Sequence, residues 1–506
     1  MDLLREILRI VSSKSNRSNL DLLLREDGDS STLSSRFLQG LVSGTYNTDT
    51  EAAADLYCAG AKDPRYRTLK SRTFERLTIS VLHLNIRQPE HSEYLSSYYK
   101  CIRYEVAAQT LMRFASRRAG YFVALKTLSI AQRYHISSVC LSLSALLRDS
   151  AALWGNQSDF YHYSERVRYY SKALVAEYES DFLLDDLRLE LQVTHYDRSY
   201  YSNKHKSILD SITSMCESHP THSLVLNKYR ASIDYYETIE DFEEVRVQCD
   251  DAINYLNCNP HLTQPARTGE FLLRRVAADI YSRRPITDNV IAECSTLFVD
   301  GGPNWHATMI LLFVSKMNDM KILQAIDVFR TVSTMGNFEG LHGLMKERWL
   351  IHSSYLMLAR ELEIVESSDY YSEGFRLSTF LNSLTNESKS KRGANSLIVI
   401  FHAFYLLVTN KFDLAEKRIE YLNVYCTRYL RDRQHTRVRV FIKALQQIPR
   451  YRGDVAGLRL ALNPYLKEIK SAASIPMPGE VNELLPYDVI LEAYVRKLEK
   501  EASARH

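Results

Sequence analysis

Acidic side chains crowd the segment YYETIEDFEEVRVQCDDAINYL, residues 235–256, and carboxylates are groups that proteins use for general acid–base chemistry. The segment carries Glu237, Glu240, Asp241, Glu243, Glu244, Asp250 and Asp251. Acid–base catalysis needs two groups whose environments push their pKa values apart, and a solvated run of like charges lacks that asymmetry. Negative charge in the first turn of a helix instead stabilises the helix by about 0.3–1 kcal/mol per residue. We therefore predict a structural role for this cluster.

Two histidines, His219 and His222, stand three residues apart in the stretch HPTH and raise the question of a metal site. No Cys or Glu lies at a zinc-ligand spacing from them, and the chain has no HExxH motif. Pro220 between them is typical of a link between elements, which favours a surface link over a metal site. His162 and His402 are interpreted as structural histidines.

Other signatures of enzymes are missing from the sequence. It has no GxxxxGK[ST] or GxGxxG phosphate loop and no GxSxG turn, and its eight cysteines form no CxxC pair. We therefore predict a non-enzymatic protein with no catalytic residues, no cofactor and no metal. The alternative is an enzyme whose site is assembled from helices far apart in the sequence. Short sequence motifs do not detect a site of that kind.

One basic stretch, RYLRDRQHTRVRVFIK, places cations among aromatic side chains over residues 428–443. The cations are Arg428, Arg431, Arg433, Arg437, Arg439 and Lys443. Such a pattern is typical of proteins that bind single-stranded nucleic acid through phosphate contacts and base stacking. It is also typical of an amphipathic helix whose Arg stems cover apolar neighbours. The net charge of only +3 favours the second interpretation. The smaller cluster Arg113, Arg117 and Arg118 has the same two interpretations.

The elements that carry these side chains are predicted to be helices. Gly (17) and Pro (12) are scarce among 506 residues, which leaves few breakers and favours helices with short links. Tyr229, Ile233 and Tyr236 share a face at helical spacing, and a polar break, ETIED, follows them. A second apolar face comes next: Phe242, Val245, Cys249 and Ala252. Two such stripes predict an antiparallel helix pair.

This pair resembles the tetratricopeptide repeat, in which two helices carry aromatic and small residues at fixed places and a late Pro follows. Tyr229, Tyr236, Phe242, Ala252 and Pro260 match that pattern, whereas Ile233, Val245 and Cys249 depart from it. Segments around Ala124, Ala325 and Ala415 are similar. Positions 124, 245, 325 and 415, taken as equivalent, predict a period of roughly 40 to 45 residues, which is longer than the standard repeat.

The resemblance implies an all-α fold: a right-handed superhelical solenoid of antiparallel helix pairs. We predict an N-terminal helical segment over 1–100, a repeat array over 101–473, and a linker with a C-terminal capping helix over 474–506. Each unit of such an array buries its apolar face against its neighbour, and therefore the array needs a cap. The apolar run 397–408 is predicted to be a buried helix, because it is too short to span a membrane.

The expected function is a cytoplasmic interaction scaffold or adaptor that binds a protein or peptide and no membrane. The start of the chain lacks the pattern of a secretory signal. The resemblance implies that the first helix of each unit lines the binding surface, and in the unit at 229 this gives Asn227, Arg230, Asp234 and Glu237. The alternative is a regulatory nucleic-acid binder that uses the basic helix 428–443. The partner and the oligomeric state stay open.

Overall fold

The computed structural model is built from helices. It describes residues 1–14, 32–81, 92–114, 116–193, 198–282, 284, 288–336, 338–341, 343–365, 377–383, 394–429, 436–472 and 483–503. These residues contain no β-strand, and consecutive helices pack together in pairs, which confirms the predicted all-α class. The chain groups into two compact units, residues 1–179 with 259–264 and residues 180–258 with 265–506.

The first unit begins with four helices that share one core. They are α1 (Asp2–Lys14), α3 (Leu33–Val42), α4 (Asp49–Tyr57) and α5 (Pro64–Val81). Phe37 and Tyr66 are fully buried among them, with ring centroids 5.9 Å apart. Thr48 and Glu51 form a capping box at the start of α4, as the Thr cap and acidic first turn of that segment indicate.

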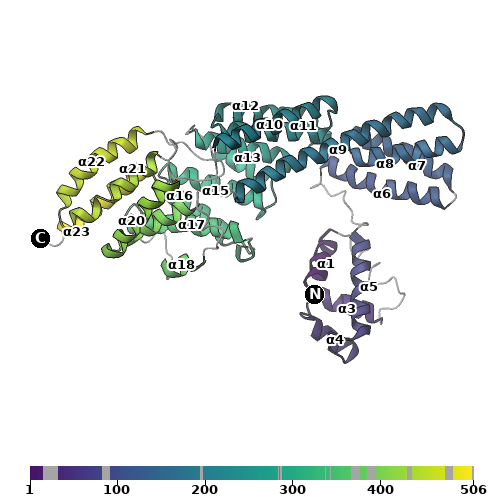
Figure 1. Ribbon diagram of the computed structural model, residues 1–506. Coiled ribbons are helices and arrows are strands. Elements are labelled where there is room, and N and C mark those ends of the chain that lie inside the picture. The colour runs from purple at the N-terminus through teal and green to yellow at the C-terminus, as the bar shows by residue number, and fades with distance from the viewer. Residues whose placement is uncertain are drawn as a thin grey trace. The chain divides into compact units, whose positions relative to one another are not determined.

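A second group of helices in this unit forms a bundle. It contains α6 (Glu93–Arg113), α7 (Arg117–Arg133), α8 (Ser137–Leu153) and the first part of α9 (Gln157–Val193), which run side by side in Figure 1. Its core includes Cys101, Ala124 and Leu143, and Leu262 of the short helix η1 (Pro260–Leu262) is buried in the same core. With 37 residues, α9 is much longer than the other three helices of the bundle.

The second unit contains the remaining helices. After the end of α9 these are α10 (Arg198–Ser218), α11 (His222–Thr238), α12 (Phe242–Cys258), α13 (Pro265–Tyr281), α14 (Asp288–Thr296), α15 (Pro303–Asn318), α16 (Ile322–Ser333), η2 (Phe338–Gly340), α17 (Gly343–Glu361), α18 (Leu377–Ser383), α19 (Ala394–Val408), α20 (Phe412–Tyr429), α21 (Thr436–Leu445), η4 (Ile448–Tyr451), α22 (Val455–Ser471) and α23 (Tyr487–Ser503). The apolar run 397–408, predicted to be a buried helix, lies in α19. At the C-terminal end of the unit, α23 packs beside α21 and α22 (Figure 1).

The same three-residue link joins five helix pairs. It occupies 134–136, 154–156, 239–241, 319–321 and 409–411. Its middle residue has positive φ each time: His135, Gly155, Glu240, Met320 and Asn410. In each link the amide of the third residue donates to a carbonyl five residues back, as from Asp241 to Tyr236 at 3.0 Å. This is the Schellman arrangement, which satisfies the last carbonyls of a helix.

A small or medium-sized buried side chain follows four of these links at the place where the paired helices approach. Cys140, Val245, Ala325 and Ala415 each stand four residues after their link and are buried. In α7 the corresponding residue, four after Ser116, is Gly120. A Cβ at Gly120 would lie only 2.8 Å from Met112 Cγ, so the two helices approach closely there. The residue of α7 that corresponds to Val245 is therefore Gly120. The prediction from the sequence placed it four residues too late, at Ala124. One helical turn keeps the same face, so the apolar pattern alone does not reveal the shift.

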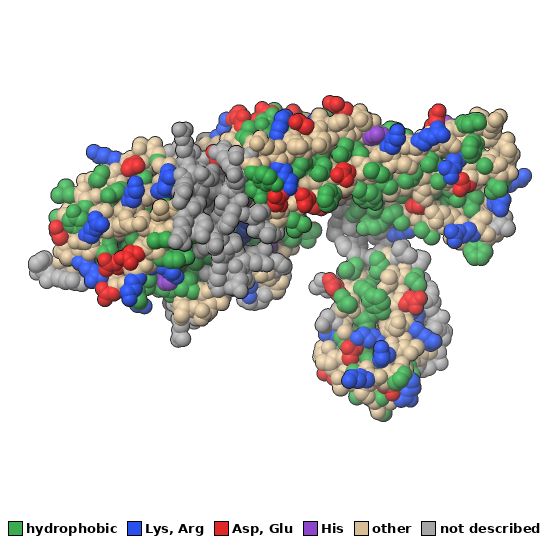
Figure 2. Space-filling view, viewed as in Figure 1, with side chains coloured by type: hydrophobic (Ala, Val, Ile, Leu, Met, Phe, Trp, Pro, Cys, Tyr) green, Lys and Arg blue, Asp and Glu red, His purple; other side chains and the backbone are tan. Residues whose placement is uncertain are grey.

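The described surface carries charges of both signs among hydrophobic side chains (Figure 2). Within the described residues, no helix is both long enough and apolar enough to cross a membrane.

Candidate binding site on α18 to α20

The four residues predicted to contact a partner lie on α11 and interact with neighbouring helices. Asn227 is buried and donates to Ser180 Oγ and Asp181 Oδ1 of α9, at 2.8 Å each. Arg230 forms a bidentate ion pair with Glu270 of α13, with both nitrogen–oxygen distances at 2.7 Å. These side chains therefore tie α11 to the elements on either side of it.

Asp234 and Glu237 share one cation, Arg274 of α13. Each carboxylate has an oxygen 2.5 Å from Arg274 Nη2. Burial alone would lower the pKa of Arg274, but the attraction of the two carboxylates outweighs it and holds that pKa above its usual value. In the same acidic segment, Asp250 pairs with Arg275 at 2.9 Å. The acidic segment thus contributes ion pairs between helices, and a role of α11 in partner binding stays a prediction.

The basic helix predicted as a nucleic-acid contact is only partly within the described residues. Arg431 and Arg433 lie outside them, as does the side chain of Arg428. Arg437 is buried and pairs with Glu483, from Nε at 2.9 Å and from Nη2 at 2.8 Å. Arg439 is half-buried and Lys443 is exposed. Nucleic-acid binding by this helix stays a prediction, and a test of it should leave Arg437 unchanged, because that guanidinium connects helices.

His222 is not on the surface as predicted. It is buried in the first turn of α11, where its ring stacks on Tyr255 and its Nδ1 lies 3.2 Å from the Tyr255 hydroxyl. Thr221 ends the link and caps α11 by accepting from the Leu224 amide. Among the described residues, no group of three or more His, Cys, Asp or Glu side chains is placed to hold a metal ion.

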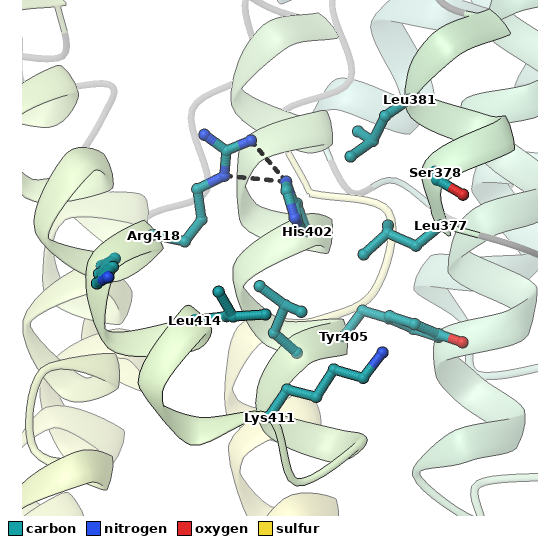
Figure 3. A pocket seen from close by; sticks show the side chains of 10 residues that line it. Leu377, Ser378, Leu381, His402, Tyr405, Lys411, Leu414 and Arg418 are labelled. Carbon is teal, nitrogen blue, oxygen red and sulfur yellow. Dashed lines mark hydrogen bonds between the residues drawn. The ribbon is translucent and has the colours of Figure 1, made fainter.

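A pocket of about 680 Å³ lies between α18, α19 and α20. Its wall contains four leucines and three cations: Leu377, Leu381, Leu406, Leu414, Lys411, Lys417 and Arg418. Ser378, His402 and Tyr405 complete the lining. Figure 3 shows Arg418 of α20 and His402 of α19 pointing toward each other, with Leu377 and Leu381 of α18 on the opposite side.

The polar centre of the pocket is a contact between Arg418 and His402. Arg418 donates to His402 Nδ1 from Nε at 2.9 Å and from Nη2 at 2.6 Å. Burial and the adjacent guanidinium lower the pKa of His402 to about 4, so the imidazole is neutral at pH 7 and its Nδ1 accepts. Arg418 is half-buried, and its guanidinium also lies over the Tyr421 ring, 5.4 Å from the centroid.

The three cations of this pocket have no acidic counterpart in the described part of the chain, where no carboxylate lies within ion-pair distance of Lys411, Lys417 or Arg418. A neutral imidazole satisfies donors of Arg418 without cancelling its charge. Such a half-buried guanidinium favours an anion, and an Arg is suited to a carboxylate or phosphate because of its planar fork of donors. The surrounding leucines favour an apolar group beside that anion.

Sequence reasoning missed this pocket. His402 and Arg418 come from two helices and the opposite wall from a third, and no motif links positions 377, 402 and 418. His402 was interpreted only as a structural histidine in a buried run. One sequence signal could have indicated the pocket: a histidine inside an apolar helix, followed by an arginine on the next helix.

No protein-family model, curated protein or solved structure matches this chain.

Proposed function

We propose that this protein is a non-enzymatic interaction scaffold that binds a partner protein, with the pocket of α18 to α20 as a principal contact. The occupant is an extended acidic segment of the partner that also carries apolar side chains. The observation that carries the proposal is the half-buried Arg418, whose hydrogen-bond acceptor is a neutral histidine.

The architecture of this scaffold is proposed to be a tetratricopeptide-like solenoid with a right-handed superhelical path. The partial motif match around Tyr229 supports it, and so do the repeated link and the small residue that follows most of these links. Solenoids of this kind present long surfaces to extended ligands, which suits a peptide-binding pocket. A cytoplasmic location is part of the proposal and rests on the eight cysteines, all of which are free thiols.

A peptide-display selection from a random library tests this proposal, because it does not require the partner to be identified. Immobilised wild-type protein is expected to enrich sequences that combine Asp or Glu with Leu or other apolar residues. The Arg418→Gln variant removes the charge while keeping a polar side chain of moderate length. It is expected to bind the enriched peptides about tenfold or more weakly, because charge-assisted hydrogen bonds contribute about 1.5–3 kcal/mol.

Arg452→Gln is the matched control. Arg452 is an exposed arginine that pairs with Asp413 of α20 at 2.9 Å, outside the pocket lining. It is expected to leave peptide binding unchanged. Enriched sequences without acidic residues, or equal binding by wild type and the Arg418 variant, would refute the proposed role of the pocket. Circular dichroism of both variants establishes that they are folded.

A further inference from the structure

The end of the α6–α9 bundle at which α6 meets α7 concentrates positive charge. Arg113 is the last residue of α6, and Arg117 and Arg118 are the first two residues of α7. All three side chains are exposed. Within the described residues, none of them has a carboxylate at ion-pair distance. Three guanidinium groups therefore face solvent within one helix-to-helix connection.

Aromatic side chains lie beside these arginines. Trp154, which follows α8, is 47% exposed, and Phe114 in the α6–α7 connection is 81% exposed. Trp154 contacts the Tyr121 ring, with centroids 4.9 Å apart and planes inclined by 58°. Ser116, Arg117, Arg118, Tyr121 and Trp154 together line a hollow of about 790 Å³. The indole is thus held from one side and accessible from another.

Two acidic residues of this bundle, Asp149 and Asp159, interact with side chains other than the three arginines. Asp159 accepts hydrogen bonds from the Asn156 amide at 2.7 Å and from the Tyr121 hydroxyl at 3.4 Å. Asp149 pairs with Arg148 at 2.8 Å. Neither forms an ion pair with the three arginines. Arg148 offsets the charge of Asp149, and the single carboxylate of Asp159 does not offset three guanidinium groups, so the local charge stays positive.

We propose that this bundle-end surface, made of Arg113, Phe114, Arg117, Arg118 and Trp154, binds single-stranded nucleic acid. Guanidinium groups bind phosphates bidentately, and exposed aromatic rings stack on bases. Stacking requires a free base face, which a single strand offers and a duplex does not. The surface shares no residue with the predicted basic helix 428–443 or with the peptide pocket.

Fluorescence anisotropy with fluorescein-labelled oligo(U) and oligo(dT), each roughly 15 nucleotides long so that they span one single-strand site, tests this proposal on the full chain. Wild type is expected to bind at low salt and to lose affinity as salt rises. Replacing both Arg117 and Arg118 with Ala is expected to reduce the slope of log K against log salt by about 1.4, at about 0.7 per phosphate contact on single strands. Trp154→Ala is expected to weaken binding about fivefold or more, and Trp154→Phe to restore most of it.

A matched control removes two charges elsewhere in the same bundle. Arg168 and Lys172 are exposed on α9, and replacing both with Ala is expected to leave binding unchanged. The two oligonucleotides distinguish RNA from DNA, and tighter binding of either one supports the proposal. Absence of binding, an equal effect of the control pair, or equal affinity for a duplex of the same length would overturn it. Polyglutamate that competes as well as oligo(U) would overturn it too and would assign the surface to acidic protein segments instead.

Discussion

Arg437 is expected to be a principal support of the C-terminal helices, and removing its side chain tests how the buried network of α21 to α23 works. The guanidinium belongs to α21 and pairs with Glu483, which precedes α23, while the side chains of the pair are only 8% and 9% exposed. It also donates to the carbonyls of Ile469 and Ala472 at the end of α22. Burial opposes its charge, yet pairing with Glu483 raises its pKa above the usual value.

The expected cost of Arg437→Ala is about 3–5 kcal/mol, because removal of one partner leaves a buried carboxylate unpaired. The number of bonds gives a similar figure: two charge-assisted hydrogen bonds to Glu483 at about 1.5–3 kcal/mol each. Arg459→Ala is the matched control. Arg459 of α22 pairs with Glu499 of α23 at 2.9 Å, but the side chains are 53% and 41% exposed. Its loss is expected to cost at most about 1 kcal/mol.

Native-state hydrogen exchange of α23 is the appropriate assay, because a chain with two compact units does not unfold in a single two-state step. A loss of about 3 kcal/mol corresponds to roughly 150-fold faster exchange in α23. Replacing both Arg437 and Glu483 with Leu is expected to restore most of the protection, since no unpaired charge is then buried. Equal protection of α23 in the Arg437 and Arg459 variants would refute the reasoning.

Three further predictions concern the core and the ion pairs of the second unit. Val245→Asp is expected to cost several kcal/mol in exchange protection of α12 because Val245 is fully buried, whereas Val247→Asp on the 44% exposed side should change it by less than about 0.5 kcal/mol. Burial lowers the pKa of His352 to about 4 from 6.5, so the stability that its neutral form contributes is complete above pH 6.5. Up to about 3 kcal/mol of it is lost as the pH falls toward 4. Hydrogen exchange of α17, corrected for the intrinsic pH dependence of exchange, should show a shallower loss of protection for His352→Gln across this range. Arg274→Met is expected to destabilise α11 and α13 by about 3 kcal/mol in hydrogen exchange, and neutralising its two carboxylates as well should recover most of that loss.

The apolar pattern predicted the helices well, because helical spacing is a local property of the sequence. The stripes of 229–256 correspond to α11 and α12, and the break between them corresponds to the link at 239–241. A helix was predicted within 474–506, and α23 (Tyr487–Ser503) lies there. The start of the predicted linker, residues 474–482, lies outside the described residues.

Contacts between helices were less accessible to sequence reasoning. Periodicity shows that Arg230, Asp234 and Glu237 share a face of α11, and it does not show that Glu270 and Arg274 of α13 meet them there. In the same way, the rotation of α20 against α19 brings Arg418 to His402, although neither residue is marked by a motif. Pairing of charges across helices depends on three-dimensional placement, which the order of residues specifies only indirectly.

The repeated three-residue link shows that one backbone geometry accepts very different side chains. His, Gly, Glu, Met and Asn all occupy its left-handed position, at φ values between 51° and 67°. The four that are not glycine tolerate a strain of roughly 1 kcal/mol each, so the backbone conformation persists although the side chain changes. The shared geometry keeps the length of the connection and the path of the chain the same in all five links. The length of the link therefore matters more than the identity of its residues. One inserted residue in a link is expected to disturb the packing of a helix pair more than substitutions within it.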